Sequence, residues 1–466
     1  MGYIILGEEM GDTIAAIATA SGEAGVGIVR ISGDKSLDIM KKMFLKCPQN
    51  PVERHVYFGR VLDVIENEIV DEAIFIFMKG PATYTGEDVL EIQAHGSDVG
   101  LKKILKSAIY SGARIAEPGE FTKLAFLNGK LDLTQAEAVM DLISAKSEFP
   151  LKIAERQLEG KLGKTIIKIR EDLLNLLAEI TVSIDFPDED IEEFTKNELK
   201  DKAFEIEKSV KELINTASIG MIAKNGFKVS IIGKPNVGKS SLLNGILGED
   251  RAIVTDISGT TRDTIEERIF IKGIPVILSD TAGIRETEDI VENIGIERAK
   301  KAIEGSDLTI AVMDLSREFS KEDKHIIEIL KEKRYILVLN KKDLEKNLSE
   351  KELMKMTGPD KRTIYTDMNS YEGIDNVLEA VKDILEREYL TKNHENGVVT
   401  DERQREILER SEKDIREGIA LLERGESLEI TEILFRNAFR SLGEIIGEEA
   451  GEQVLDRVFS RFCLGK

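Results

Sequence analysis

The chain has 466 residues, with 65 Lys and Arg against 87 Asp and Glu, so its formal net charge is −22. This length suffices for about two to four domains with substantial cores. The acidic balance excludes a global attraction to nucleic acid or an anionic membrane, so any RNA contact must be local or shared with a partner. The two cysteines, Cys47 and Cys463, form no metal-spaced cluster, and no apolar run reaches the ~18 residues of a membrane span. We therefore expect a cytoplasmic protein without a membrane segment.

The first ~125 residues indicate an α+β domain. Residues 36–44 and 100–111 have helical periodicity, and Gly, Asp and Pro bound the short apolar runs between and around them. These runs predict strands at 26–31, 56–61, 73–78 and 89–92.

Helical periodicity then dominates to about residue 217. Thr134 and Glu137 have the spacing of a capping box at the start of this region. Apolar residues recur every three or four positions from Leu158 to Ile180, which predicts one bundle helix that Gly160 and Gly163 weaken locally.

Residues 226–385 alternate buried strands with helices, the pattern of a doubly wound α/β domain. The predicted strands are 229–232, 269–271, 276–279, 308–313, 335–339 and 363–365. Helical pattern resumes at residue 400 and continues to the end. Because neither helical half alone makes a large core, we interpret the α/β domain as an insertion into one helical domain.

A Walker A loop opens the inserted domain, with the pattern Gly233-x-x-x-x-Gly238-Lys239-Ser240. Glycines let backbone N–H groups face a phosphate, and the following helix adds the positive end of its dipole. Lys239 is expected to reach the β- and γ-phosphates, and Ser240 to supply an oxygen to Mg²⁺.

Two further motifs follow in the order of a GTP-binding domain, each at the end of a predicted strand. Asp280-Thr-Ala-Gly283 matches D-x-x-G, which supports Mg²⁺ and meets the γ-phosphate. Asn340-Lys341-Lys342-Asp343 matches N-K-x-D, whose carboxylate accepts the N–H groups of guanine and would stay unpaired against adenine. Thr261 lies between the first two motifs, where a second Mg²⁺ oxygen is expected.

Two details differ from Ras-type domains. Ile284 occupies the position of the glutamine that orients water in Ras-type proteins, so hydrolysis needs another group. Asn236 lies within the P-loop, and the segment 255–263 follows it. Both features resemble the potassium-activated GTPases of the translation-factor class, in which a monovalent cation replaces an arginine finger.

The chain resembles the MnmE (TrmE) family of tRNA-modification GTPases over essentially its whole length. The residues that carry the resemblance are DTIAAIAT (12–19), GVGIVRISG (25–33), YTGEDVLEIQAHG (84–96), PGEFTKLAFLNGKLDLTQAEAV (118–139), GKPNVGKSSLLN (233–244), AIVTDISGTTRDTIEE (252–267), DTAGIRET (280–287), VENIGIERA (291–299) and RFCLGK (461–466).

The resemblance implies a domain organisation and a reaction. A tetrahydrofolate-binding-like, dimer-forming N-terminal domain is expected over 1–127, a helical domain over 128–223 and 389–466, and an inserted G domain over 224–388. With an FAD-dependent partner of the MnmG type, in a heterotetramer or larger assembly, the homodimer would add a (carboxymethyl)aminomethyl group at C5 of the wobble uridine of certain tRNAs. The one-carbon unit would come from 5-formyl- or 5,10-methylene-tetrahydrofolate.

The resemblance also assigns site residues. Folate contacts fall on Arg30, Glu91, Lys130 and Lys466; Mg²⁺ on Ser240 and Thr261; K⁺ on Asn236, Thr255, Ile257 and Thr260. Catalytic roles fall on Lys239 and on Glu292, which would position water in place of the absent glutamine, and an unspecified role near the folate falls on Cys463. The expected GTP-binding residues are Gly233, Asn236, Val237, Gly238, Lys239, Ser240, Ser241, Thr255, Asp256, Ile257, Ser258, Gly259, Thr260, Thr261, Asp280, Thr281, Ala282, Gly283, Asn340, Lys341, Lys342, Asp343, Asp367, Met368 and Asn369.

Simpler interpretations remain open for the folate residues. A lone Arg or Lys is usually a surface charge, whereas Glu91 suits a pterin N–H edge and Arg30 suits acceptor atoms. Cys463 stands between Phe462 and Leu464, so a buried apolar role is the alternative to a functional thiol.

The sequence departs from the family at the fifth guanine motif, where Asp367-Met368-Asn369 replaces the usual Ser-Ala followed by Lys or Arg. This loop mainly contributes backbone N–H groups, so nucleotide affinity is what the change puts in question. Residues 20–22, Ala-Ser-Gly, also replace a Pro-Pro-Gly turn of the family.

Two other functions would also use a GTP-binding domain. A ribosome-assembly GTPase would be expected to carry a basic RNA-binding appendage such as a KH domain, or a second G domain, and the sequence contains neither motif. A scaffolding GTPase would leave the folate-like segments without a purpose. Tetrahydrofolate binding by the N-terminal region in the dimer would separate tRNA modification from both.

Overall fold

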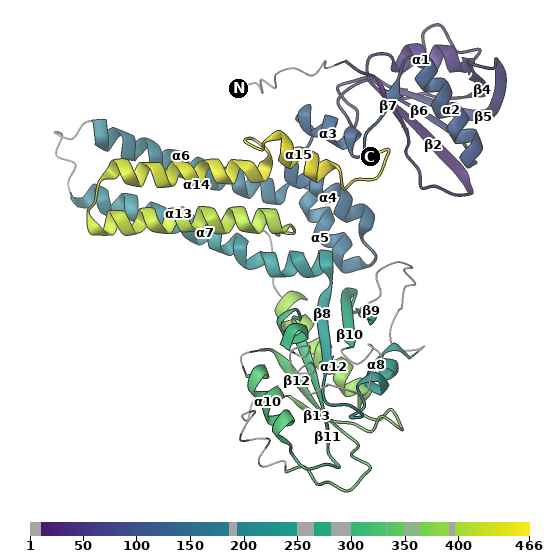
Figure 1. Ribbon diagram of the computed structural model, residues 1–466. Helices are drawn as coiled ribbons and strands as arrows, with labels where there is room; N and C mark the ends of the chain where they lie inside the picture. Colours follow the sequence, from purple (N-terminus) through teal and green to yellow (C-terminus); the bar gives the residue numbers. More distant parts are fainter. Residues whose placement is uncertain are drawn as a thin grey trace. The chain divides into compact units, whose positions relative to one another are not determined.

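The computed structural model describes residues 11–185, 193–248, 265–280, 300–331, 333–349, 353, 355, 357, 362–390 and 397–466. The chain divides into two compact units, whose elements are labelled in Figure 1. Unit 1 comprises Met1–Met140, Gln157–Glu207 and Arg410–Lys466, and unit 2 comprises Asp141–Arg156 and Lys208–Glu409. Within the described ranges, no helix is both long and apolar enough to cross a membrane.

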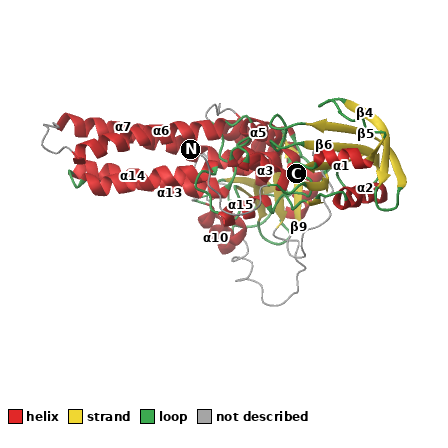
Figure 2. Ribbon diagram, turned by 90° about the horizontal axis from the view of Figure 1, so that it is seen from above, coloured by secondary structure: helices red, strands yellow, loops and turns green. Residues whose placement is uncertain are grey.

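Unit 1 contains a mixed seven-stranded sheet in the order β3-β4-β5-β6-β2-β1-β7. Helices α1 (Ser36–Met43) and α2 (Asp98–Tyr110) pack on one face of it, with Met40 and Ile104 in one core with Phe75 (Figure 2). The predicted strands and helices of this region are confirmed. Three further strands were missed because two to four residues are too few to display an alternating pattern. The strands are β1 (Ile14–Ile17), β2 (Ala24–Ser32), β3 (Phe44–Leu45), β4 (Val56–Asp63), β5 (Glu68–Met78), β6 (Val89–Gly96) and β7 (Arg114–Ile115).

Helices α3 (Glu120–Leu127), α4 (Leu133–Ser144) and α5 (Glu148–Leu158) follow the sheet along the chain, and the segment Asp141–Arg156, which holds the end of α4 and most of α5, belongs to unit 2. The predicted capping box at Thr134 and Glu137 is wrong, because α4 begins two residues earlier than that box requires. Asp132 Oδ1 accepts the Gln135 N–H at 2.9 Å, and Gln135 Oε1 accepts the Asp132 N–H at 3.0 Å. The carboxylate and amide thus make the reciprocal pair that caps the helix.

Long helices make up most of the rest of unit 1, and Figures 1 and 2 show them side by side as a bundle. The single helix predicted from residue 158 is wrong at its start, because Gly160 adopts φ +74° and separates α5 from α6. From Leu162 to Ile180 the predicted apolar stripe is confirmed as buried. The bundle helices are α6 (Lys161–Asp185), α7 (Glu193–Asn225), α13 (Glu402–Arg424) and α14 (Leu428–Ile446), of which α7 and α13 continue into unit 2. The short helix α15 (Glu452–Phe459) follows and packs Phe459 near Phe126 of α3.

Unit 2 contains a six-stranded sheet in the order β13-β12-β11-β8-β10-β9, in which only β9 is antiparallel to its neighbour. Along β11, Ile310 faces a core shared with α8 and α12, whereas Ala311 faces a second core shared with α10. Helices therefore cover both faces, which confirms the predicted doubly wound fold. The elements are β8 (Phe227–Ile232), α8 (Lys239–Leu247), β9 (Ile265–Ile271), β10 (Ile274–Asp280), β11 (Leu308–Asp314), α10 (Lys321–Leu330), β12 (Tyr335–Asn340), β13 (Thr363–Tyr365), α12 (Ile374–Leu385) and the π-helix η1 (Glu386–Leu390).

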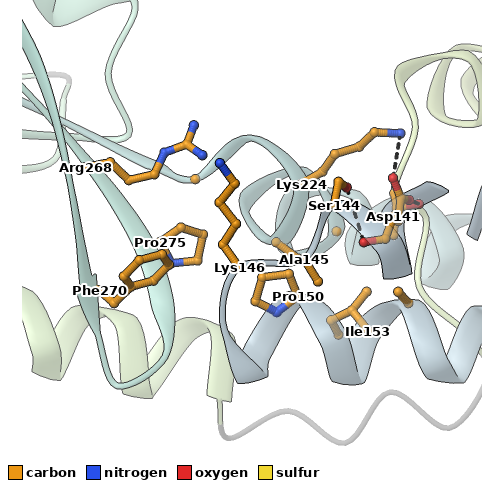
Figure 3. Close-up of a pocket in the computed structure, with 15 residues that line it drawn as sticks. Asp141, Ser144, Ala145, Lys146, Pro150, Ile153, Lys224, Arg268, Phe270 and Pro275 are labelled. Carbon is orange, nitrogen blue, oxygen red and sulfur yellow. Dashed lines mark hydrogen bonds and ion pairs between the residues drawn. The ribbon is translucent and has the colours of Figure 1, made fainter. Parts of the chain in front are cut away.

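The end of α7 and the returning segment 397–401 meet within unit 2. The Val399 N–H donates to Thr216 Oγ1 at 3.0 Å, and a Cβ on Gly220 would lie 2.0 Å from the Val399 carbonyl oxygen. One turn further, Lys224 pairs with Asp401 at 3.0 Å. Lys224 also pairs with Asp141 of α4 at 3.3 Å (Figure 3). Gly220, Lys224 and Asp141 border a cavity of about 50 Å³. Together, the contacts join the two chain connections of the α/β domain.

Candidate functional site

The P-loop follows β8 with a backbone that side chains would obstruct. Gly233 has φ +150° and Gly238 has φ +106°, and a Cβ on Gly238 would lie 2.3 Å from Asn340 Nδ2. Asn236 also adopts a positive φ, +61°, which Asn tolerates better than most residues. The sequence pattern thus corresponds to a turn that keeps its backbone N–H groups accessible.

Lys239 opens helix α8, whose first N–H groups have no intrahelical acceptor and attract anions. The Lys239 ammonium is buried and donates to the carbonyl oxygen of Lys234 at 2.7 Å, inside the loop that it closes. Lys234 in turn pairs with Asp323 of α10 at 3.1 Å. The P-loop is therefore fastened at both its start and its end.

Asn340 ties the P-loop to the segment that supplies the fifth guanine motif. Its Nδ2 donates to the Val237 carbonyl at 2.8 Å, and its Oδ1 accepts from Thr366 Oγ1 and the Met368 N–H at 3.2 Å each. Asn340 is only 2% exposed. A buried amide with three hydrogen bonds to other segments fixes these loops relative to one another.

The unusual fifth motif folds into an ordered turn. Asp367 Oδ1 accepts the Asn369 N–H at 2.9 Å, and Asp367 Oδ2 accepts the Ser370 hydroxyl at 2.5 Å. These hydrogen bonds lower the pKa of the Asp367 carboxyl, and each has a larger effect than burial, which opposes them. The Asp367 side chain therefore stabilises this turn.

These loops enclose a pocket of about 540 Å³, a size typical of small-molecule sites. Most of the described residues predicted to bind GTP line it, whereas Asp343 is exposed and Lys342 pairs with Glu372 at 2.5 Å. The lining residues are Pro235, Asn236, Gly238, Lys239, Ser240, Ser241, Asn340, Lys341, Asp367, Met368 and Asn369.

Several predicted residues of this site lie outside the described residues. Asp280 is the last residue of β10, beside Ile231 of β8 in the parallel register. Beyond the described ranges are Thr255, Asp256, Ile257, Ser258, Gly259, Thr260, Thr261, Thr281, Ala282, Gly283 and Glu292.

In unit 1, the predicted folate residues Arg30 and Glu91 form an ion pair. They face one another across β2 and β6, and Arg30 Nη2 lies 2.9 Å from Glu91 Oε1. Their side chains are 19% and 17% exposed, so the pair is shielded but reachable. The guanidinium carbon of Arg30 lies 5.8 Å from the centre of the Phe121 ring. The pair thus combines charge, hydrogen-bonding capacity and an aromatic neighbour.

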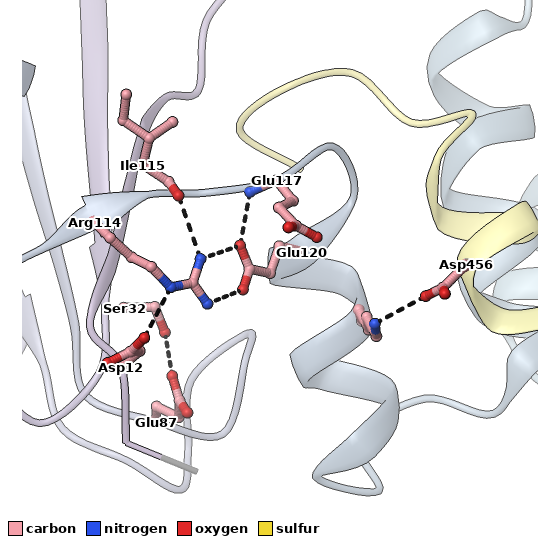
Figure 4. A network of polar contacts seen from close by, with 9 residues as sticks. Asp12, Ser32, Glu87, Arg114, Ile115, Glu117, Glu120 and Asp456 are labelled. Carbon is pink, nitrogen blue, oxygen red and sulfur yellow. Dashed lines mark hydrogen bonds and ion pairs between the residues drawn. The ribbon is translucent and has the colours of Figure 1, made fainter. Parts of the chain in front are cut away.

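Helix α3 is held near this pair by a second ionic network (Figure 4). Arg114 binds Glu120 at 2.5 Å and Asp12 at 3.1 Å, and Glu120 also accepts the Glu117 N–H at 2.7 Å. The Glu120 carboxylate raises the pKa of Arg114. Because Glu120 precedes Phe121, this network fixes the position of the ring beside Arg30.

The C-terminal tail reaches the same sheet. Gly465 has φ +89°, and a Cβ there would lie 2.3 Å from the Ile17 carbonyl oxygen of β1, the strand paired with β2. Phe462 is buried beside Phe459, whereas Cys463 is exposed, so the interpretation of Cys463 as a buried apolar residue is wrong. Lys466 is half-buried. The structure brings the tail against β1, the neighbour of the strand that carries Arg30, which sequence spacing could not indicate.

Lys130, also predicted to bind folate, contacts a different segment from the one that holds the Arg30–Glu91 pair. Its ammonium donates to the Pro81 carbonyl oxygen at 3.0 Å and is solvent-exposed. Tyr84, which the sequence did not single out, donates or accepts a 3.0 Å hydrogen bond with Thr122, next to Phe121. Burial raises the pKa of the Tyr84 hydroxyl, so it stays protonated near neutral pH.

Comparison with known proteins identifies relatives of the whole chain. The family model described as GTP-binding protein TrmE N-terminus matches residues 13–130, and the MnmE helical domain model matches residues 133–463. The tRNA modification GTPase MnmE of Alkaliphilus metalliredigens is 46% identical over 98% of this chain and 99% of its own length. The protein of that name from Clostridioides difficile is 45% identical over 98% of this chain and 99% of its own. The G domain of the T. maritima FeoB iron transporter is 28% identical and covers 34% of this chain and 97% of that domain, with a TM-score of 0.25.

Family models that together match most of the chain agree with relatives that match it from end to end. The chain belongs to the MnmE family of tRNA modification GTPases.

Proposed function

We propose that the chain couples potassium-activated GTP hydrolysis to tRNA modification in the cytoplasm. Together with an FAD-dependent MnmG-type partner, it adds a (carboxymethyl)aminomethyl group at C5 of the wobble uridine of certain tRNAs. The observation that carries the proposal is the presence, in one chain, of a P-loop pocket and a shielded Arg30–Glu91 pair. Relatives that carry the name tRNA modification GTPase support it over the full length.

The pocket residues are suited to the two metal ions. The Ser240 hydroxyl at the start of α8 and the Asn236 amide both line the pocket and offer the oxygen atoms that Mg²⁺ and K⁺ prefer. We assign Mg²⁺ to Ser240 and Thr261, and K⁺ to Asn236, Thr255, Ile257 and Thr260. When bound, the cations neutralise charge that develops on the phosphates, while Lys239 positions the phosphates and Glu292 positions the water.

The N-terminal sheet is proposed to bind the folate and to form the homodimer. Glu91 can accept from the pterin N–H edge, and Arg30, Lys130 and Lys466 can bind acceptor groups such as the glutamate tail. The exposed Cys463 lies next to Phe462, which anchors the tail, so its thiol is accessible to the same region. We propose the domain boundaries 1–127, 128–223, 224–388 and 389–466. In this division, residues 1–127 bind folate and form the homodimer, residues 224–388 bind GTP, and the other two ranges form the helical domain.

The modification itself has a direct test. Deleting the gene and analysing the nucleosides of bulk tRNA should reveal wobble uridines that lack the aminomethyl-type group, and the gene on a plasmid should restore them. Unchanged wobble uridines in the deletion strain would contradict the proposed function.

We expect GTP turnover to be at least ~10-fold faster in KCl than in NaCl, because K⁺ supplies the charge that an arginine finger supplies elsewhere. The measurement is steady-state phosphate release at matched ionic strength. GDP affinity in the two salts serves as the control and should be equal. Equal turnover in both salts would rule out the potassium mechanism.

Replacing Arg30 by Ala should weaken tetrahydrofolate binding at least ~10-fold, because a shielded charge-assisted hydrogen bond is lost. Calorimetric titration of the full chain measures this. Arg60→Ala is the matched control, since Arg60 also pairs with a glutamate across the sheet, but at 3.4 Å and with its side chain 56% exposed. Equal weakening in both variants would assign the effect to the sheet and not to the ligand.

A further inference from the structure

A buried carboxylate that belongs to no nucleotide motif lies beside the predicted guanine-reading loop. Asp314 is the last residue of β11 and is 5% exposed. In the parallel register it lies opposite Asn340, and the Leu315 N–H donates to the Asn340 carbonyl at 2.9 Å. The side chain of Asp314 is thus placed where the N-K-x-D segment begins.

The two oxygen atoms of Asp314 have different partners. Oδ1 accepts the N–H and the hydroxyl of Ser316 at 2.9 and 2.6 Å, which closes a tight turn. Oδ2 binds the Lys341 ammonium at 2.6 Å and Arg317 Nε at 3.3 Å. These contacts outweigh burial and lower the pKa of the Asp314 carboxyl, so it is ionised at neutral pH. Of the two cations, Lys341 makes the shorter and less exposed contact.

Lys341 has an unusual backbone at this point. Its φ of +64° lies in the left-handed region, which a residue without a short polar side chain rarely adopts. Lys341 also lines the P-loop pocket, next to Asn340. With its ammonium fixed at Asp314, its four-carbon stem follows one path along the pocket instead of moving freely in solvent.

We propose that Asp314 is a positioning residue for the base end of the nucleotide site: by holding the Lys341 ammonium, it makes the Lys341 stem one wall of the base pocket. A flat purine packs against an apolar stem, and an ordered stem costs less entropy to use when the base binds. The inference rests on the proposed guanine-nucleotide site, and it adds to that site a residue from a different strand.

The test is a double-mutant cycle in the full chain. Asp314→Asn keeps an acceptor for Ser316 but removes the charge, and Lys341→Met keeps a stem but removes the ammonium. We expect each variant to bind GDP about 10-fold more weakly, and the double variant to bind no more weakly than the worse single one, because each change breaks the same contact. Inhibition of fluorescent-nucleotide binding by magnesium pyrophosphate should be unchanged, because pyrophosphate uses only the P-loop.

Arg317→Gln is the matched control, because Arg317 touches the same Asp314 oxygen atom but is 57% exposed; it should bind GDP like the unmodified chain. Unchanged GDP affinity in Asp314→Asn, an additive double variant, or an equal loss of pyrophosphate binding would each overturn the inference. Should Asp314→Asn fail to fold, Lys341→Met alone decides, since Lys341 lies in a partly exposed loop. An unmodified chain that does not prefer GDP to ADP would instead overturn the proposed guanine site itself.

Discussion

Replacing Asp343 by Asn is expected to weaken GDP binding by about 10⁴-fold and to make xanthosine diphosphate the better ligand. The carboxylate would accept both N–H groups of guanine, whereas the asparagine amide presents a donor to the guanine amino group. Xanthine carries a carbonyl oxygen at that position, which accepts a hydrogen bond from the asparagine amide. Titration calorimetry with the two nucleotides in the presence of Mg²⁺ measures the exchange of preference.

Glu345→Gln provides the control for this exchange, because Glu345 is an exposed carboxylate two residues away. It should leave both affinities unchanged. Retention of GDP affinity within about threefold in Asp343→Asn would mean that this carboxylate does not read the base, whatever the motif suggests.

Replacing Gly220 by Ala is expected to destabilise unit 2, although the same change inside a helix ordinarily stabilises by up to ~1 kcal/mol. The new Cβ would lie 2.0 Å from the Val399 carbonyl oxygen, so the returning segment must move. Overpacking of this kind costs about 1–3 kcal/mol, which lowers a melting temperature by several degrees. Scanning calorimetry measures it, and GDP identifies the transition of the nucleotide domain by raising its temperature.

A helical glycine in open surroundings serves as the comparison. A Cβ on Gly100 of α2 would have Ser97 as its near neighbour, at an ordinary contact distance of 3.6 Å, so Gly100→Ala should not lower any transition. A rise of the GDP-sensitive transition in Gly220→Ala would show that the close approach to Val399 does not limit stability.

Local sequence patterns were sufficient to predict most helices and strands and the P-loop. Alternating or continuous apolar runs predicted the strands of the unit 2 sheet and the four longer strands β2, β4, β5 and β6 of the unit 1 sheet, and the Walker A spacing predicted the loop that Gly238 and Asn340 close. Prediction failed where one residue outweighed a longer pattern. Gly160 breaks a helix that its apolar neighbours would continue, and Asp132 caps α4 in place of Thr134.

Contacts between distant segments could not be derived from spacing. Nothing in the sequence links Asp314 to Lys341 or Gly465 to Ile17, because strand register and the path of the tail decide both. The burial of Phe462 and the exposure of Cys463 depend on one turn of the tail against α15. The amino-acid composition does not predict that turn. Asp343 and Glu91 were identifiable only through motifs, since an acidic chain offers many equivalent carboxylates.

The junction at α7 has a consequence for how such a chain could arise. A domain can be inserted into a host without disturbing it when the ends of the insert lie close together. Here Thr216 and Gly220 touch Val399, and Lys224 binds Asp401, so the chain leaves and re-enters the helical fold at one point. The nucleotide domain therefore meets the geometric condition for a module gained in a single recombination event, and a short bridge across this junction is all that its loss would require.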